Sequence, residues 1–172
     1  SRLDAIAKEA HRYRGFNLIA GDTDSLYYFS NQGGGVQRLA PGIYGLSNHF
    51  LDTPWPKVTA GKKRFAELLY ARNGDVDIEG LFGLLEDRSC PPDSRLPDTG
   101  VGRHWERILA PIFIESEIYG TRTSSVLLID YSGAVRFLER AHDGHDRQTR
   151  ERSFQVRAPA GAESAHSICD TR

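Results

Sequence analysis

The sequence predicts an α+β fold in which antiparallel sheets and helices form layers. The chain of 172 residues is the size of one domain and is long enough to bury a hydrophobic core. Roughly six or seven short strand-like runs and three helical patterns follow one another without the strict alternation that a parallel sheet requires. Residues 130–133 resemble a tight turn between two apolar runs, which is typical of an antiparallel hairpin.

The first part of the chain predicts one helix and a set of short strands. Apolar side chains in residues 3–13 fall on one helical stripe, and Gly15 follows as a stop signal. Strand-like runs come next, separated by turn residues: 16–22, 25–30 and 36–40. Residues 41–48 begin with a Pro-Gly turn and are expected to run extended to Asn48.

Two helices and a loop are predicted in the middle of the chain. The first helix has Asp52 or Thr53 as a capping residue, tolerates prolines in its first turn and ends before the Asn-Gly pair at 73–74. The second helix covers residues 76–88. The Pro, Gly and Asp content of residues 89–103 indicates a loop.

The last part of the chain returns to strands. The predicted strands are residues 112–117, 123–131 and 134–140, with 153–156 as a possible edge strand. Gly133 can take the positive φ that the turn between the last two long strands requires. Residues 1–157 are therefore expected to form a single domain, and residues 158–172 a tail without apolar periodicity.

The composition is that of an ordinary globular protein. It is 39% hydrophobic and 26% charged with a net charge of −1, which gives no electrostatic argument for nucleic acid or an anionic membrane as partner. No run approaches the roughly 20 apolar residues of a membrane span. Cys90 and Cys169 are too few for a disulfide framework or a zinc-ligand set. We therefore expect a cytoplasmic protein with neither a nucleic-acid partner nor a membrane span.

Several polar motifs have simple structural explanations. His142 and His145 lie in a polar stretch without nearby cysteine or glutamate at ligand spacing, so solvated loop histidines are expected. The glycines at 33–35 are not followed by Lys-Ser or Lys-Thr, which favours a turn over a phosphate loop. Glu115 and Glu117 alternate along a predicted strand and should face solvent. No metal site is predicted.

Asn48 and Arg122 stand out because each closes an apolar strand with a polar group. Taken alone, Asn48 is explained by a turn or helix cap, and Arg122 by a salt bridge to a surface carboxylate. Local sequence favours these explanations. The ends of strands are, however, where sheet proteins place functional residues, so both remain candidates for a site.

Longer motifs resemble a known family. The resemblance rests on the runs YRGFNLIAGD, PGIYGLSNHFLDTPWPK, LPDTGVG, WERILAPIFI, IYGTRTSSVLLID and VRFLER. Together they resemble the NRDE family, also known as the transport and Golgi organisation 2 family, and look like its bacterial branch. The motifs stand in the family's order over about residues 13 to 140.

The resemblance implies an N-terminal nucleophile (Ntn) hydrolase-like fold, an αββα sandwich of antiparallel sheets. Full-length members begin Met-Cys and carry an early Asn-Arg-Asp-Glu signature, and neither is present in this sequence. We therefore expect the C-terminal portion of a single family domain, with a sandwich incomplete at its N-terminus and no amide hydrolysis by this chain alone. An exposed sheet edge could then pair with another copy of the chain, giving a homo-oligomer.

The resemblance also implies roles for the two candidate residues. In related hydrolases an asparagine helps form the oxyanion hole and an arginine on a later strand steadies the nucleophile's surroundings, and Asn48 and Arg122 match these by order. Arg122 is expected to close the polar end of a pocket between the two sheets, in one cavity with Asn48. The residues expected to bind ligand beside it are Tyr119, Gly120, Thr121 and Thr123.

The functional expectation is ligand handling. Family membership implies binding or trafficking of a hydrophobic ligand such as haem or an acyl or lipid compound. The alternative is hydrolysis of linear amide (C–N) bonds by the Ntn mechanism in the full-length protein, and a structural role without ligand is a third possibility. No cofactor is required. Haem would be cargo, held by apolar walls with Arg122 at a propionate, because no histidine makes a convincing axial ligand.

Overall fold

The structure, a computed structural model, describes residues 2–70, 75–142 and 149–155. This part of the chain holds four α-helices and six strands, which confirms the predicted α+β class. The helices are α1 (Arg2–Glu9), α2 (Pro56–Tyr70), α3 (Ile78–Leu85) and α4 (Arg103–Leu109). The strands are β1 (Asn17–Gly21), β2 (Leu26–Ser30), β3 (Gly35–Leu39), β4 (Thr123–Ile129), β5 (Ala134–Ala141) and β6 (Thr149–Gln155). No helix in the described residues is long and apolar enough to cross a bilayer.

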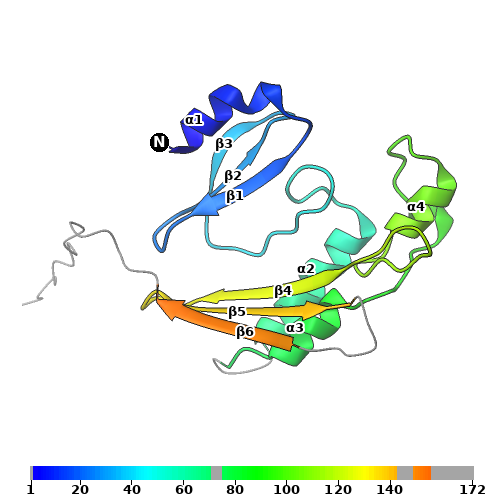
Figure 1. The fold of residues 1–172 in the computed structure, drawn as a ribbon. Helices are drawn as coiled ribbons and strands as arrows, with labels where there is room; N and C mark the ends of the chain where they lie inside the picture. Colours follow the sequence, from blue (N-terminus) through cyan, green and yellow to red (C-terminus); the bar gives the residue numbers. More distant parts are fainter. Residues whose placement is uncertain (1, 71–74, 143–148, 156–172) are drawn as a thin grey trace, which may run out of the picture.

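The strands form two antiparallel sheets in the orders β1-β2-β3 and β4-β5-β6 (Figure 1). Local turn chemistry joins neighbouring strands. The Asp22 carboxylate accepts a hydrogen bond from the Asp24 N–H between β1 and β2. Between β4 and β5, the Asp130 carboxylate accepts one from the Ala134 N–H, and Gly133 has a φ of 81°. The predicted hairpin at 130–133 is therefore confirmed.

The hydrophobic core lies between the second sheet and the helices α2 and α3. Phe82 of α3 is fully buried and packs with Leu81, and with Val126 and Leu138 from adjacent strands. Side chains alternate across a strand, so the other face of β4 carries Leu127, which is 56% exposed. The two helices therefore cover one face of this sheet.

The first sheet is joined to the segment that follows α1 by an asparagine and by aromatic rings. Asn31 donates hydrogen bonds to the carbonyls of Ala10 and Arg14 and accepts one from the Phe16 N–H. The Phe16 and Phe29 rings meet edge-on, with 5.9 Å between their centroids. In Figure 1, α1 lies on the side of this sheet away from the second sheet; α3 lies beyond the second sheet, and α2 begins above β4 and passes behind it. The layers therefore follow the order helix, sheet, sheet, helices.

Two predicted strands are wrong. Residues 41–48 join no ladder and run as an irregular connection between β3 and α2. Residues 112–117 are irregular because the backbone turns back on itself there: the Ile114 N–H donates to Thr121 Oγ1, and the Thr121 N–H donates to the Ile114 carbonyl. The apolar character of this run reflects burial, since Phe113 is 5% exposed, rather than strand pairing. The helix α4 was not predicted.

Some predictions concern residues outside those that the structure describes, and others stay untested. The predicted tail, 158–172, and His145 lie outside them. Within them, the outer strands of each sheet pair on one side only. Pairing of another chain at such an edge stays a prediction. The last strand, β6, begins earlier than the expected 153–156 run.

Candidate functional site

The connection between β3 and α2 borders three cavities, and we call residues 44–50 the connecting segment. The helix cavity, of about 310 Å³, lies between this segment and the helices α2 and α3. The sheet cavity, of about 680 Å³, lies between the segment and the first sheet. The loop cavity, of about 310 Å³, lies between Asn48, the start of α2, and α4 with the loop before it. These volumes fall in the range of small-molecule sites.

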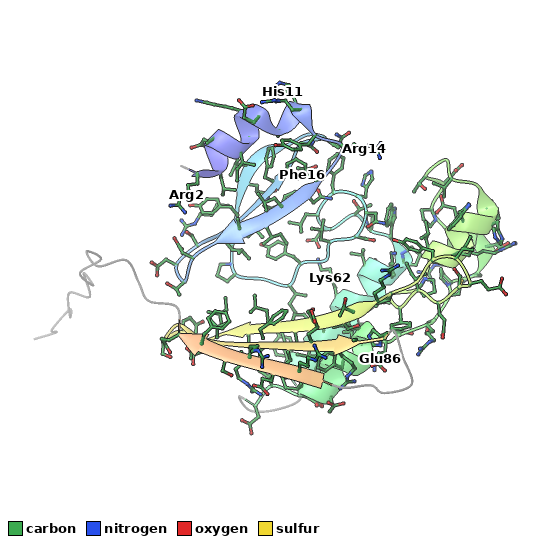
Figure 2. All side chains as sticks on the ribbon, viewed as in Figure 1. Arg2, His11, Arg14, Phe16, Lys62 and Glu86 are labelled. Atoms are coloured by element: carbon green, nitrogen blue, oxygen red, sulfur yellow. The ribbon has the colours of Figure 1, made fainter. Side chains whose placement is uncertain are left out.

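Asp52 closes the loop that carries the connecting segment. Its Oδ1 atom accepts a hydrogen bond from the Gly45 N–H at 2.8 Å, and its N–H donates to the Gly45 carbonyl at 2.8 Å. The ammonium of Lys62 on α2, labelled in Figure 2, lies 2.7 Å from the same Oδ1. The expected capping of α2 by Asp52 or Thr53 is wrong: Asp52 makes these contacts, and the Thr53 hydroxyl donates to the Phe50 carbonyl.

The charge of Asp52 is stabilised in this loop. Partial burial acts to raise the pKa of the Asp52 carboxyl, but the Lys62 ammonium and the Gly45 N–H outweigh it and bring the pKa below its ordinary value. Asp52 also has a φ of 57°, a left-handed conformation that aspartate tolerates better than most residues. The turn therefore depends on both the shape and the charge of this residue.

Gly45 lets the connecting segment approach α2 closely. A Cβ atom placed on Gly45 would lie 2.7 Å from Val58 Cγ1 and 3.3 Å from the Lys62 stem. Val58 is buried and has no flexible end that could move away. A residue without a side chain is therefore needed where the segment crosses the helix.

The segment is also fixed to the first sheet. The Asn17 side chain donates to the His49 carbonyl at 3.0 Å, and accepts from the Tyr28 hydroxyl at 2.6 Å. That hydroxyl in turn accepts from the Leu51 N–H. Asn48 lies between these contacts, is exposed, and borders both the sheet cavity and the loop cavity. Within the described part of the chain its amide makes no hydrogen bond, so it can serve a ligand.

The helix cavity has mainly apolar walls. Apolar side chains of the segment, α2, α3 and the run after α4 line it: Leu46, Val58, Phe65, Leu84, Leu85 and Ile112. Gly61, in the interior of α2, also lines it. A Cβ atom on Gly61 would meet only Ile112 Cδ1, at 3.4 Å, which is close to ordinary contact. The sequence therefore leaves open a space that a small side chain could enter.

The loop cavity combines apolar walls with two charged groups. Glu106 of α4 is 4% exposed, and its Oε1 accepts hydrogen bonds from the Thr99 N–H at 2.6 Å and the Thr99 hydroxyl at 2.7 Å. Lys57 of α2 donates from Nζ to the Leu109 carbonyl at 2.8 Å. Burial lowers the pKa of the Lys57 ammonium below its ordinary value. Trp55 forms part of the wall.

Arg122 occupies a different environment. It precedes β4, is exposed, and borders a cavity of about 330 Å³ together with Glu117, Tyr119 and His142. Within the described residues the Arg122 guanidinium makes no ion pair and no hydrogen bond. The salt bridge to a surface carboxylate that local sequence favours for Arg122 is therefore not observed there. The cavities that Asn48 borders have no residue in common with that of Arg122. The structure therefore does not bring these two residues to a shared cavity.

The residues expected to bind ligand beside Arg122 mainly stabilise their own turn. Thr121 exchanges hydrogen bonds with Ile114, and the Tyr119 N–H donates to the Ser116 hydroxyl. Tyr119 and Gly120 are exposed and line the same cavity. Thr123 is exposed at the start of β4. Their roles in binding stay predictions.

Sequence reasoning missed Lys57 and Glu106. Each is a charged residue on the apolar face of a helix. Lys57 shares its face with Gly61 and Phe65, and Glu106 shares its face with Leu109. A charge at such a position is a usable signal, because an ordinary amphipathic helix keeps charges on the opposite face. No cluster of three or more His, Cys, Asp or Glu side chains that could hold a metal occurs in the described part of the chain.

Comparison with known proteins places these features in a family. A sequence profile for the family described as Transport and Golgi organisation 2 matches residues 1–144. The chain is 38% identical over 162 residues to a Transport and Golgi organization protein 2 homolog of Bos taurus, covering 85% of this chain and 57% of the relative. A Homo sapiens homolog is 38% identical over 154 residues, covering 82% and 55%. A Mus musculus homolog is 34% identical over 157 residues, also covering 82% and 55%.

The chain spans about half the length of the curated relatives that it matches. The match takes in the connecting segment, all four helices and the first five strands. The profile and the relatives agree with the resemblance predicted from the sequence motifs. This chain belongs to the Transport and Golgi organisation 2 (NRDE) family.

Proposed function

We propose that the protein binds a hydrophobic ligand of the acyl or lipid class, and that the helix cavity holds the apolar part of this ligand. The observation that carries the proposal is Gly61. A glycine in a helix interior costs about 1 kcal/mol relative to alanine, and here it faces a cavity where a methyl group would fit. A ligand that fills this space would offset the cost of the glycine in the helix.

The walls of the helix cavity suit an acyl chain. Apolar side chains from α2, α3 and the connecting segment surround it, and its polar groups include the two lysines Lys57 and Lys62. Burial of methylene groups against such walls is favourable by about 0.8 kcal/mol for each group. A volume of about 310 Å³ lies at the lower end for small-molecule sites, which favours one short chain.

Haem is a second candidate ligand, and the size of the sheet cavity favours it. That cavity has about 680 Å³ and is bordered by Phe16, His49 and Phe50. His49 uses Nδ1 in a contact with Thr53 Oγ1 at 2.8 Å, which leaves its Nε2 for another partner. Arg122 borders a separate cavity, so a propionate contact with Arg122 does not follow from this site.

Hydrolysis of linear amides in a full-length family member is the alternative activity. The order helix, sheet, sheet, helices in Figure 1 is the layer order of an Ntn-hydrolase-like sandwich, and this supports the proposal of that fold. Asn48, whose amide has no hydrogen-bond partner in the described residues, would be the oxyanion donor. Loss of turnover in an Asn48→Ala variant of a full-length relative, with substrate binding retained, would support this role.

Two substitutions of Gly61 test acyl binding in the helix cavity. Gly61→Leu should fill the cavity, whereas Gly61→Ala leaves most of the volume and slightly favours the helix. Calorimetric titration with decan-1-ol should show binding to the original chain and to Gly61→Ala. Affinity should fall at least about tenfold in Gly61→Leu. No binding to the original chain, or undiminished binding to a folded Gly61→Leu, would contradict the proposal.

A further inference from the structure

The Lys57 ammonium borders the loop cavity, and the protein uses only part of its hydrogen-bonding capacity. Lys57 Nζ donates one hydrogen bond, to the carbonyl of Leu109 at the end of α4. Within the described residues no carboxylate lies at ion-pair distance from it. An ammonium has three donors, so two N–H groups remain for other acceptors. Burial of a cation beside one neutral acceptor is unfavourable, and a bound anion would offset that cost.

Other groups in the loop cavity determine the shape and polarity of an anion that would fit there. Trp55, Pro91, Pro97 and Val101 supply apolar walls. Asn48 lies at the same cavity with an amide that has no hydrogen-bond partner in the described part of the chain. A ligand that fits would therefore have a compact apolar body and one polar end that accepts hydrogen bonds.

The remaining charges around Lys57 limit the ligand to a single negative charge. Glu106 borders the same cavity, and both Thr99 donors hold its Oε1. Its negative charge opposes a second anion, and opposes a dianion more strongly than a monoanion. On the helix-cavity side of Lys57, the Lys62 ammonium is already paired with Asp52. Lys57 is therefore the cation available to a ligand in the loop cavity.

We propose that the loop cavity is a second binding site, which takes a compact apolar monocarboxylate. The carboxylate accepts hydrogen bonds from the Lys57 ammonium and the Asn48 amide, and the apolar body lies against Trp55 and the neighbouring prolines. This site is distinct from the acyl site proposed in the helix cavity. Lys57 is the only lining residue that the two cavities share. A purely structural role for Lys57, as a cap of the α4 C-terminus, would give no selectivity for an anion.

Trp55 provides the readout, because it is one of two tryptophans in the chain and borders the loop cavity. Trp105 does not border it, so the Trp105→Phe variant makes fluorescence report on Trp55 alone. In this background, hexanoate and hexan-1-ol offer the same apolar body with and without a carboxylate. Hexanoate should bind at least about tenfold more tightly, since a charge-assisted hydrogen bond is lost in the alcohol.

Four further variants separate binding from folding. Lys57→Gln should weaken hexanoate binding about tenfold, and Lys57→Arg should retain most of it. Glu106→Gln leaves Lys57 and Leu109 unchanged and should tighten hexanoate binding several-fold by removing the opposing charge. Lys63→Gln is the matched control, because Lys63 lies on α2 with its side chain 81% exposed and should leave affinity unchanged. Thermal unfolding of each variant establishes that it is folded.

The outcomes distinguish this site from the acyl site. Equal affinity for hexanoate and hexan-1-ol, or weaker hexanoate binding in Glu106→Gln, would overturn the monocarboxylate site while leaving acyl binding in the helix cavity intact. Undiminished hexanoate binding in Gly61→Leu, together with loss of decan-1-ol binding, would show that the two cavities act separately. Absence of any Trp55 response to hexanoate would also overturn the proposal.

Discussion

The regions around Asn48 and Arg122 carry similar sequence signals, but the structure builds them in different ways. The chain around Asn48 is held against α2 by Gly45 and Asp52 and against the first sheet by Asn17, and it borders three cavities. The chain around Arg122 bonds mainly within its own turn and borders a separate cavity. In this chain, a polar residue beside an apolar run borders several cavities only where the chain also packs on a second element.

The largest expected effect is at the crossing of the connecting segment and α2. Gly45→Ala should lower the free energy of unfolding by about 1–3 kcal/mol, because the new methyl group would overlap Val58. Thermal unfolding should show a Tm about 2–10 °C lower. Gly42→Ala is the control: its Cβ would make ordinary contacts with the Tyr44 ring, at 3.4 Å and beyond. Equal Tm values for the two variants would show that the close approach of Gly45 to Val58 does not contribute to stability.

In the Arg122 region, the largest effect should come from Thr121. Thr121→Val removes the hydroxyl that accepts the Ile114 N–H, and should cost about 1–2 kcal/mol of unfolding free energy. Thr123→Val, at an exposed strand position, should change it by less than about 0.5 kcal/mol. Chemical denaturation of both variants measures the difference. A larger loss in Thr123→Val would mean that the turn is stabilised by other contacts.

A smaller effect with a distinct pH dependence is expected at Asp52. Asp52→Asn keeps the acceptor oxygen but loses the ion pair with Lys62, which should cost about 0.5 kcal/mol at neutral pH. The folded pKa of Asp52 is depressed, so its contribution is present above the unfolded pKa of about 4. It is lost as pH falls through the lower folded value. The difference in Tm between the original chain and Asp52→Asn should therefore disappear in acid; a constant difference would contradict this assignment.

The smallest stability effects are expected at Asn48 and Arg122 themselves. Both are exposed and neither side chain has a hydrogen bond in the described residues, so Asn48→Ala and Arg122→Lys should each change the unfolding free energy by less than about 0.5 kcal/mol. Their binding effects should differ. Asn48→Ala should weaken hexanoate binding in the loop cavity, whereas Arg122→Lys should not, because its cavity is separate. Equal losses of affinity would show that the two regions do act on one ligand.

The elements that were predicted correctly are those that local chemistry specifies. Asp22 and Asp130 supply side-chain acceptors for tight turns, and the strands beside them alternate in apolar character. The run 112–117 has the same apolar character, but its buried residue Phe113 packs against Arg88 and His142 rather than in a strand ladder. Local pattern cannot distinguish these two causes of burial. The family resemblance rested on long motifs, which is why it was confirmed although single elements were wrong.

The candidate site was predicted only in part. Asn48 was selected as the end of a strand, and it is instead part of an irregular segment whose position depends on Gly45, Asp52 and α2. Those contacts join Gly45 to Asp52 and Val58, and Asp52 to Lys62, and neither helical nor strand periodicity specifies them, so the sequence did not reveal which cavities Asn48 would border. Lys57 and Glu106 were missed because charged residues in helices are usually solvent-facing, and because Glu106 lies on α4 and Lys57 contacts Leu109 at the end of α4, a helix that was not predicted.

The connecting segment has a consequence for equilibrium binding. Asn48 borders the sheet and loop cavities, and Lys57 borders the helix and loop cavities, so none of these three cavities has walls entirely its own. A ligand that displaces either residue changes the free energy of binding at the neighbouring cavity. Thermodynamic reciprocity then requires the second ligand to change the affinity of the first by the same factor. Two ligands that displace Asn48 or Lys57 would then bind cooperatively through a single short stretch of backbone.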